Sequence, residues 1–360
     1  MAQNSISGLP RPRARAASSN HAGRFERLSA ELVDDGWGLP DDLPPLRTEV
    51  SVKVPRRVIT RNTSPDIAFD RSINPYRGCE HGCIYCFARP THAFLGLSPG
   101  LDFETRLVAR PDAPAVLETE LRRKSYRCDV IAIGTNTDAY QPIERDRKIM
   151  RGILQVLQAF RHPVGIVTKG TLVERDIDIL SEMAGDGLAR VGLSVTTLQG
   201  DLARKMEPRV PSPKRRLQAV ERLSNAGVPV RVMISPIVPG LTDHEIEALV
   251  IAARDAGAVA VSMIPLRLPR EVAGLWRDWL AEHYPHRLEK VMSKIRDMHG
   301  GQDYDAEWGK RMTGQGLWAD LLQKRFARAR RAAGLEVELP PLRTDLFQVP
   351  LAKGDQLALF

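Results

Sequence analysis

The sequence predicts an α/β fold, a parallel sheet with helices packed outside it, on three observations. Strand-like and helix-like patterns alternate between residues 66 and 266 with short connections and no repeat of fixed period. The chain has 360 residues, 43% hydrophobic and 27% charged, which is enough for one large domain with extensions. Polar, glycine or proline residues stand at the ends of the predicted strands, where such folds place their active sites.

The first predicted strand, residues 67–74, leads into a loop rich in cysteine. Residues 113–127 follow as a helix, because two leucines stand one helical turn apart among charged residues. The β-branched run 129–135 is the second strand. Residues 147–160 then form a helix with one apolar face, made of Ile149, Ile153, Leu154 and Leu157.

Four more strands and three more helices complete the series. In chain order they are strand 164–169, helix 176–184, strand 190–196, helix 213–226, strand 228–238, helix 242–256 and strand 258–266. Pro213 stands at the start of one helix and Gly227 at its end. Thr242 and Glu245 have the spacing of a capping box. Six strands alternating with five helices imply a parallel sheet.

The formal net charge of +8 is concentrated in two short segments. Residues 1–30 carry about +4 and residues 310–331 about +6, which leaves about −2 for the rest of the chain. The body of the protein is therefore not a basic surface for nucleic acid, and any nucleic-acid contact is expected through these segments. The chain has only four cysteines, which is sparse for a disulfide-stapled protein. It shows no apolar signal core and no apolar run near the roughly 20 residues of a membrane span. These features predict a cytoplasmic protein.

Composition divides the chain into four parts. Residues 1–48 are expected to be a disordered basic tail and linker. Residues 49–268 hold the alternating domain, residues 269–345 a C-terminal helical extension and residues 346–360 a C-terminal tail. Within the extension, an amphipathic helix with a basic outer face is expected over residues 317–334, on the spacing of Trp318, Leu321, Leu322 and Phe326.

Three cysteines stand close together with the spacing C-x3-C-x2-C: Cys79, Cys83 and Cys86. Three thiolates around one small volume suit an iron–sulfur cluster and leave one iron without a protein ligand. A structural zinc site is the alternative, although such sites more often use two separated C-x2-C pairs. The fourth zinc ligand would then be Cys128, His81 or His92.

Lys169 closes an otherwise apolar predicted strand. Because an unpaired buried lysine is costly, its ammonium group is expected to face water or an anion. Another strand runs into the polar stretch 134–144, in which residues 140–144 are expected to contact the substrate. The aromatic-rich residues 270–360 are expected to contribute to the same contact.

The cysteine motif resembles the signature of the radical S-adenosylmethionine (SAM) enzymes. The resemblance implies a 4Fe–4S cluster whose free iron binds SAM, and reductive cleavage of SAM to a 5'-deoxyadenosyl radical that abstracts hydrogen from a substrate. The strand–helix series alone leaves a barrel and an open doubly wound sheet equally open. The resemblance implies a partial (β/α)6 TIM-like barrel, and a reductant protein such as flavodoxin or ferredoxin as partner.

Other segments look like the spore photoproduct lyase-like branch, often labelled DNA repair photolyase-like. They are the residues NPYRGC from Asn74, TDAYQPIE from Thr137, Thr168-Lys169, and Glu207-Pro208 followed by Arg216. This resemblance covers about residues 50–270 and implies that the cysteine triplet binds the cluster. It implies SAM contacts for Tyr85, Thr137, Lys169, Ser194, Glu207 and Arg216. For Glu207 and Arg216, an ion pair on a helix surface is an equal alternative.

One position departs from that branch. The lyase carries a hydrogen-donating cysteine near the end of the second strand, where this chain has Thr135. A threonine hydroxyl is a poor donor of hydrogen atoms. Cys128 stands at the start of the same strand, about 20 Å from the reacting end at ordinary strand rise, and is expected to be a small buried hydrophobe.

Three functions therefore stay open from the sequence. The first is a radical SAM enzyme, of lyase or oxidoreductase type, acting on an unidentified substrate. The second is a lesion repair lyase of the spore photoproduct type that contacts DNA through the basic segments. The third is a non-catalytic zinc or iron–sulfur binding protein.

Overall fold

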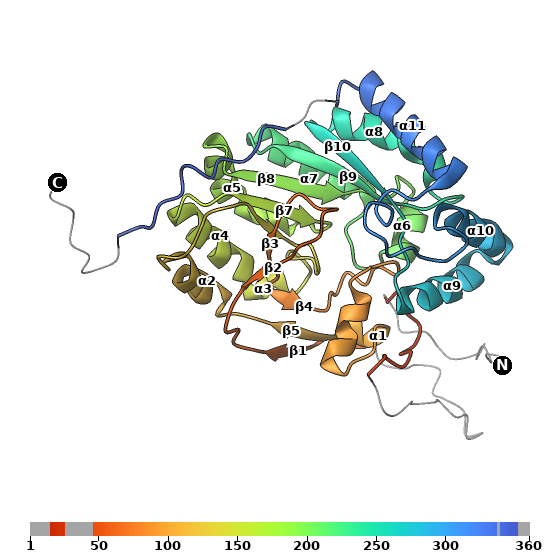
Figure 1. Cartoon of the computed structure of the whole chain (residues 1–360), viewed down its shortest axis with the longest axis horizontal. Coiled ribbons are helices and arrows are strands. Elements are labelled where there is room, and N and C mark those ends of the chain that lie inside the picture. Colours follow the sequence, from red (N-terminus) through yellow and green to blue (C-terminus); the bar gives the residue numbers. More distant parts are fainter. Residues whose placement is uncertain (1–14, 26–45, 337–338, 352–360) are drawn as a thin grey trace.

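A seven-stranded sheet forms the centre of the computed structural model, which describes residues 15–25, 46–336 and 339–351 (Figure 1). The strand order is β10-β9-β8-β7-β6-β3-β2. Neighbours from β3 to β10 pair in parallel, and β2 (Ile59–Arg61) adds an antiparallel edge beside β3. The parallel strands are β3 (Arg71–Ile73), β6 (Ile131–Ile133), β7 (Val164–Thr168), β8 (Ala189–Ser194), β9 (Val230–Ile237) and β10 (Ala260–Pro265). Both β10 and β2 are edges, so the strands do not close into a full ring, in agreement with the predicted partial barrel.

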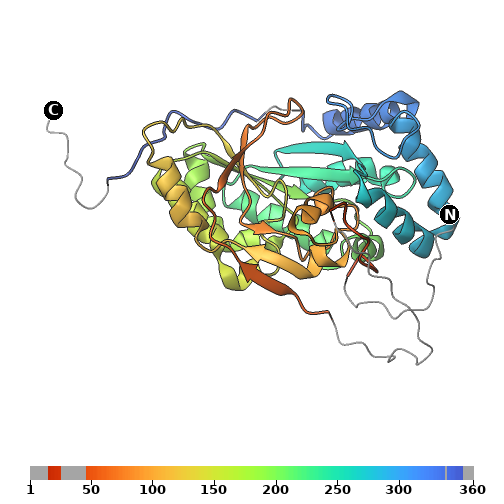
Figure 2. The ribbon, with the colours of Figure 1, turned by 60° about the horizontal axis from the view of Figure 1, so that its bottom comes forward.

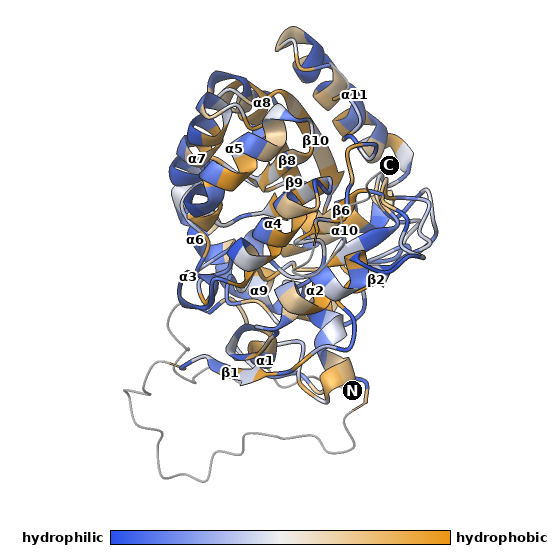
Figure 3. Cartoon of the chain, turned by 90° about the vertical axis from the view of Figure 1, so that its left-hand side faces the viewer, coloured by the Kyte–Doolittle hydropathy of each residue, from blue (hydrophilic) through white to orange (hydrophobic). Residues whose placement is uncertain are grey.

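Five helices link the parallel strands and cover the outside of the sheet. They are α2 (Ala113–Leu121), α4 (Ile149–Ala159), α5 (Ile177–Gly185), α7 (Pro213–Asn225) and α8 (Ile246–Asp255). Figure 3 shows α4, α5, α7 and α8 on the same side of the strands. The core lies between the two layers, where Leu154, Leu180, Leu223 and Val250 are fully buried. The predicted alternation of six strands and five helices is confirmed.

The structure differs from the local predictions in this series at three points. The helix expected over residues 113–127 ends at Leu121, and a separate helix α3 (Glu144–Arg147) precedes α4. No capping box forms, because the Thr242 hydroxyl accepts a hydrogen bond from the Val238 N–H at 2.8 Å. Glu245 instead accepts hydrogen bonds from the hydroxyl of Thr197 and the N–H of Leu198. Its carboxylate therefore links the start of α8 to the loop after β8.

A small second sheet, which the sequence analysis did not predict, lies beside the barrel. Its strand order is β1-β5-β4, with β1 (Glu49–Val52), β5 (Arg106–Ala109) and β4 (Tyr76–Arg77). Helix α1 (Leu101–Thr105) and the 3-10 helix η1 (Arg89–Leu95) flank it. Figures 1 and 2 show this layer along one side of the molecule, with α1 at its end. The sheet supports the cysteine loop, which directly follows β4.

Residues 15–25 lie against the folded domain, so for this part the predicted disordered tail is wrong. The Arg15 guanidinium donates to the carbonyl oxygen of Glu104 at 2.7 Å, and Ala17 is buried. Arg24 pairs with Glu271 at 2.8 Å. Residues 1–14 and 26–45, the rest of that prediction, lie outside the described residues. At the other end, residues 352–360 also lie outside them, whereas Phe347 packs against Phe160 and His162.

The C-terminal extension is helical, as expected. It holds α9 (Glu271–His283), α10 (Leu288–Met298) and α11 (Gly316–Ala332). Helix α11 buries Ala319, Leu322, Phe326 and Ala329, whereas Leu321, predicted on the inner face, is 41% exposed. No helix in the described part of the chain has the length and apolar character of a membrane span.

The positive charge of residues 310–331 is partly neutralised by neighbouring carboxylates. Arg325 pairs with Glu247 at 2.6 Å, Lys310 pairs with Glu307 at 2.6 Å, and Arg311 pairs with Asp66. The net charge counted along the sequence therefore overstates how basic this surface is.

Candidate active site

One pocket lies where the cysteine loop faces the carboxyl ends of the central strands. Its wall contains seven of the residues predicted from the sequence: Cys79, Cys83, Tyr85, Cys86, Thr137, Lys169 and Ser194. They come from the loop after β4 and from the ends of β6, β7 and β8. The pocket position follows from the fold, because parallel strands bring their carboxyl ends to one edge.

Two glycines shape the cysteine loop. Gly78 and Gly82 have φ angles of +74° and +65°, in the left-handed region that favours glycine. A Cβ on Gly78 would lie 2.5 Å from Leu107 Cδ2, and one on Gly82 would lie 2.6 Å from a carboxylate oxygen of Glu104. The loop therefore requires glycine directly before the first cysteine and directly before the second.

A buried ion pair holds the cysteine loop from behind. The side chains of Arg89 and Glu104 are both fully buried and approach to 2.5 Å. Arg89 also donates to the carbonyl oxygens of Gly82 at 3.0 Å and Cys83 at 2.9 Å. Glu104 accepts hydrogen bonds from two backbone N–H groups of residues 16–17. The pair thus connects the loop to η1, to α1 and to the N-terminal segment.

Burial raises the pKa of the thiols of Cys79, Cys83 and Cys86, so they are protonated at neutral pH unless a metal centre displaces the protons. Among the described residues, no three His, Cys, Asp or Glu side chains are already drawn together as a metal site. The donor set nevertheless fits an iron–sulfur cluster, because three soft thiolate ligands of one loop line a single, largely apolar pocket.

The carboxylate of Glu207 lies behind the pocket and gathers four polar side chains. Its Oε2 is 2.7 Å from Arg216 Nη2, and its Oε1 is 3.3 Å from Lys169 Nζ. Thr196 Oγ1 donates to Oε1 at 2.9 Å, and the Tyr85 hydroxyl donates to the same oxygen. Tyr85 and Lys169, two of the predicted site residues, are therefore oriented by Glu207, which was also predicted.

Opposing effects set the pKa of Glu207. Burial alone would raise it, but the charges of Arg216 and Lys169, with hydrogen bonds from Tyr85 and Thr196, lower it to about 2. The carboxylate is therefore charged throughout the physiological pH range. Arg216 also donates to the Ser194 carbonyl oxygen at 2.8 Å. Since the side chains of Glu207 and Arg216 are both 0% exposed, the alternative of a surface ion pair is wrong.

Lys169 faces an anion, as the sequence analysis required, but that anion belongs to the protein. Besides Glu207, its ammonium group contacts the Ser235 carbonyl oxygen at 3.3 Å and lies 5.6 Å from the centre of the Tyr85 ring. An ammonium group has three N–H donors. One is donated to the Ser235 carbonyl oxygen, and even if a second is directed at the paired Glu207 carboxylate, a third remains available. The Thr137 hydroxyl, by contrast, donates to the Tyr76 carbonyl oxygen at 2.9 Å and so is already used as a donor.

Asp138 and His81 also line the pocket, and no site role was predicted for Asp138 from the sequence. Asp138 accepts from the Thr168 hydroxyl and from the Lys169 N–H, both at 2.7 Å, and lies 3.2 Å from His81 Nδ1. Burial opposes its charge, but His81 and these hydrogen bonds lower its pKa. Asp138 directly follows Thr137 in the motif TDAYQPIE, and this position is the sequence signal that could have identified it.

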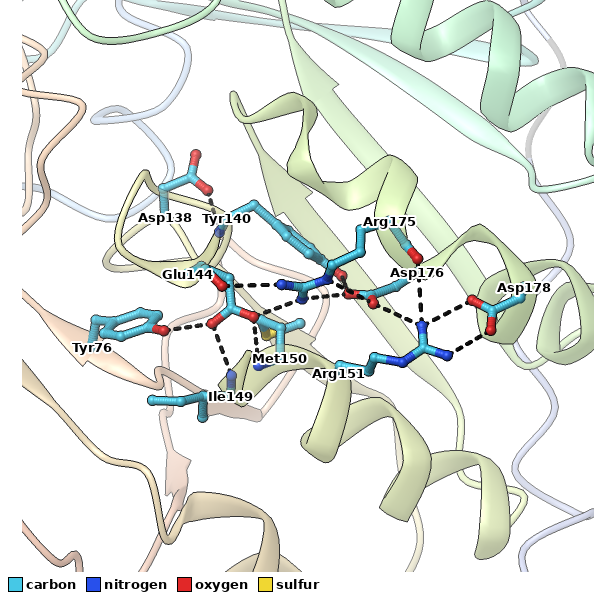
Figure 4. A network of polar contacts seen from close by, with 10 residues as sticks. All are labelled: Tyr76, Asp138, Tyr140, Glu144, Ile149, Met150, Arg151, Arg175, Asp176 and Asp178. Atoms are coloured by element: carbon cyan, nitrogen blue, oxygen red, sulfur yellow. Dashed lines mark hydrogen bonds and ion pairs between the residues drawn. The ribbon is translucent and has the colours of Figure 1, made fainter. Parts of the chain in front are cut away.

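Residues 140–144 do not contact the pocket, so the expectation that they bind substrate is wrong. Figure 4 shows Glu144 accepting hydrogen bonds from Tyr76 at 2.5 Å and from Arg175 at 2.7 Å, while the Tyr140 hydroxyl donates to Asp176 at 3.1 Å. Gln141 holds the cysteine loop, since its Oε1 accepts from the Glu80 N–H at 2.8 Å. This stretch is a buried polar support.

Thr135 and Cys128 stand at opposite ends of β6. Thr135 lines the pocket, whereas Cys128 precedes the strand and lies outside the pocket wall. Cys128 is only half-buried rather than fully buried as expected, and this burial raises its pKa to about 11.

Comparison with known sequences gives a family and several relatives. The model of the radical SAM superfamily matches residues 73–252, half of the chain. An uncharacterized protein of Mycobacterium tuberculosis is 35% identical over 285 residues, covering 78% of this chain and 83% of the relative. An uncharacterized protein of Methanocaldococcus jannaschii is 29% identical, covering 62% of this chain and 79% of the relative.

Solved structures of spore photoproduct lyase share the fold. One, complexed with dinucleoside spore photoproduct, has a TM-score of 0.55 and 16% identity, covering 79% of each chain. A double mutant with bound AdoMet and dinucleoside spore photoproduct has a TM-score of 0.56 and 15% identity, covering 81% of this chain and 85% of the lyase. On the family match over half of its length, the chain belongs to the radical SAM superfamily, whose cofactors are a 4Fe–4S cluster and SAM.

Proposed function

We propose that this protein is a radical SAM enzyme in which Cys79, Cys83 and Cys86 hold the cluster and a bound substrate loses a hydrogen atom. The observation that carries the proposal is the shared pocket of the three thiols and the strand-end residues Thr137, Lys169 and Ser194. When bound, the reduced cluster supplies the electron that cleaves SAM to methionine and a 5'-deoxyadenosyl radical. A flavodoxin or ferredoxin is the proposed electron donor.

The chain's own residues orient SAM and exclude water. The third N–H of Lys169 is available to the methionine carboxylate, with the Ser194 hydroxyl as a second donor. Glu207 keeps the ammonium and the Tyr85 ring in place. Apolar side chains around these groups, such as Val167, Met233 and Ile264, limit the access of water that would quench a radical.

The test of this function is anaerobic incubation of the reconstituted, reduced protein with SAM. Formation of 5'-deoxyadenosine, measured by chromatography, is expected with the wild-type chain. A protein that binds zinc instead of iron and sulfide, and forms no 5'-deoxyadenosine, would contradict the proposal.

Replacement of Lys169 by alanine is expected to weaken SAM binding about ten- to hundredfold, because it removes a charge-assisted hydrogen bond of roughly 1.5–3 kcal/mol. Ser194→Ala should lose less, since a neutral donor contributes roughly 0.5–1.5 kcal/mol. Thr137→Ala should change SAM affinity least, because its hydroxyl already donates to the Tyr76 carbonyl oxygen. Titration of the cluster-loaded variants with SAM measures the effect. Unchanged affinity in Lys169→Ala with a full cluster would show that Lys169 serves only its pairing with Glu207.

The enzyme is expected to cleave SAM without repairing spore photoproduct, since the pocket presents Thr135 where the related lyase branch carries its donor thiol. Incubation with the dinucleoside spore photoproduct, followed by chromatography of the products, tests this. Thr135→Cys is the matched variant, and repair gained only in that variant would support the assignment of the donor position. Efficient repair by the wild-type chain would instead establish the lesion repair lyase.

A further inference from the structure

Arg267 follows β10 and lines the rim of the same pocket. Its guanidinium carbon lies 4.8 Å from the centre of the ring of Phe87, the residue that directly follows the third cysteine of the loop. Tyr304, from the connection between α10 and α11, lies close to the Arg267 side chain. Phe87 is 46% exposed, whereas Leu266, beside Arg267 in the chain, is fully buried. The side chain is thus held between the cluster loop and the C-terminal extension.

The charge of Arg267 differs from those of the other basic groups in the pocket wall. His81 faces Asp138 at 3.2 Å, and Lys169 faces Glu207 at 3.3 Å. For Arg267, no carboxylate of the described residues lies within the 4.0 Å of an ion pair.

The nearby carboxylate of Asp66 does not fill this role. It pairs with Arg311 and accepts the Gly309 N–H at 2.7 Å. Arg267 therefore brings an uncompensated positive charge into a partly desolvated pocket, where burial lowers its pKa. Such a charge is costly until an anion joins it, and the planar guanidinium matches a carboxylate or phosphate with two parallel hydrogen bonds.

We propose that Arg267 binds one anionic group, a carboxylate or a phosphate, of a small substrate whose adjoining part is apolar. The proposal rests on the radical SAM function and specifies its substrate class. Phe87, Ile264 and Leu266 supply the apolar wall beside the guanidinium.

The anion is assigned to the substrate and not to SAM, because the SAM carboxylate already has Lys169 as its proposed partner. Lys169 ends β7 and Arg267 follows β10, three strands away in the sheet order, so the strand backbones are roughly 14 Å apart at the usual strand spacing. A nucleic-acid backbone is disfavoured as the ligand, because its successive phosphates require several cations side by side. The neighbouring Arg311 is already paired with Asp66 and does not supply a second one.

Calorimetric titration of the cluster-loaded protein, saturated with SAM, tests the proposal with three probes: sodium benzoate, inorganic phosphate and the dinucleotide thymidylyl-thymidine. Benzoate or phosphate is expected to bind to the wild-type chain, and Arg267→Met should weaken that binding at least tenfold. Arg267→Lys should retain part of it, and SAM affinity should change less than twofold in both variants. Arg254→Met, which removes an exposed cation paired with Asp255, is the matched control and should change neither.

Equal binding of benzoate and phosphate to the wild-type chain and Arg267→Met, or no binding of either to the wild-type chain, would overturn the proposal. So would a loss of SAM affinity in Arg267→Met, or a dinucleotide that binds more tightly than both small anions and binds equally well to Arg267→Met. A failure of the proposed function is distinguishable, because it would show as a missing cluster or as missing 5'-deoxyadenosine. The anion titrations measure binding alone and require no turnover. Visible absorbance and circular dichroism of each variant show that cluster and fold are intact.

Discussion

Alanine in place of Cys79, Cys83 or Cys86 is expected to abolish cluster assembly and, with it, the cleavage of SAM. Each thiolate would supply one of only three protein ligands, and the loop that carries them offers no fourth cysteine within the pocket wall. Iron and sulfide content, visible absorbance and 5'-deoxyadenosine formation after anaerobic reconstitution measure the loss.

Cys128→Ala is the matched control for this prediction. Cys128 is a free cysteine of the same chain, but it precedes β6 and lies outside the pocket. Cluster content and SAM cleavage should be preserved in this variant. A full cluster in any variant of the triplet, or loss of the cluster in Cys128→Ala, would contradict the ligand assignment.

Glu207→Ala is expected to lower the free energy of unfolding by about 3–5 kcal/mol, because removing one partner of a buried ion pair leaves an uncompensated charge. Arg216 is 0% exposed and has its Nη2 against this carboxylate, and Lys169 would lose the same partner. Urea unfolding followed by circular dichroism measures the change. The more exposed pair of Glu247 and Arg325 gives the control, since Glu247→Ala should cost less than about 1 kcal/mol.

The same carboxylate makes the fold sensitive to acid. Its pKa is lowered from 4.5 to about 2, so its contribution is fully present above pH 4.5 and is lost as the pH falls toward 2. The difference corresponds to about 3 kcal/mol of folding free energy. Glu207→Gln should therefore lose less stability than the wild-type chain across this interval. Identical slopes of stability against pH in both proteins would show that another group titrates.

The sheet and its covering helices could be predicted, because the residues that a strand or a helix buries recur at a regular spacing along the sequence. In α4 the four residues predicted on one face, Ile149, Ile153, Leu154 and Leu157, are all buried. Such local patterns do not reveal a partner distant along the chain. The side chains of Arg89 and Glu104 gave no sequence signal, although their pairing brings residues 16–17 to the cysteine loop.

The capping box failed for the same reason. Thr242 and Glu245 have the right spacing, but Glu245 meets the Thr197 hydroxyl and the Leu198 N–H, which lie after a neighbouring strand. A local hydrogen bond thus gave way to a tertiary one, since both compete for one carboxylate.

For the site, the sequence by itself determined the chemistry: a compact cysteine triplet, and polar residues that close successive parallel strands. Only the tertiary structure decided which of those groups remain available to a ligand. Lys169 and Tyr85 converge on Glu207, Thr137 is bound to the backbone of β4, and Glu144 is sealed in the network of Figure 4. Residue identity and spacing are properties of the chain, whereas the pairing of a buried charge depends on which elements pack together. Each buried polar group takes the partner that the fold brings within reach, because leaving it unpaired costs more than any local preference.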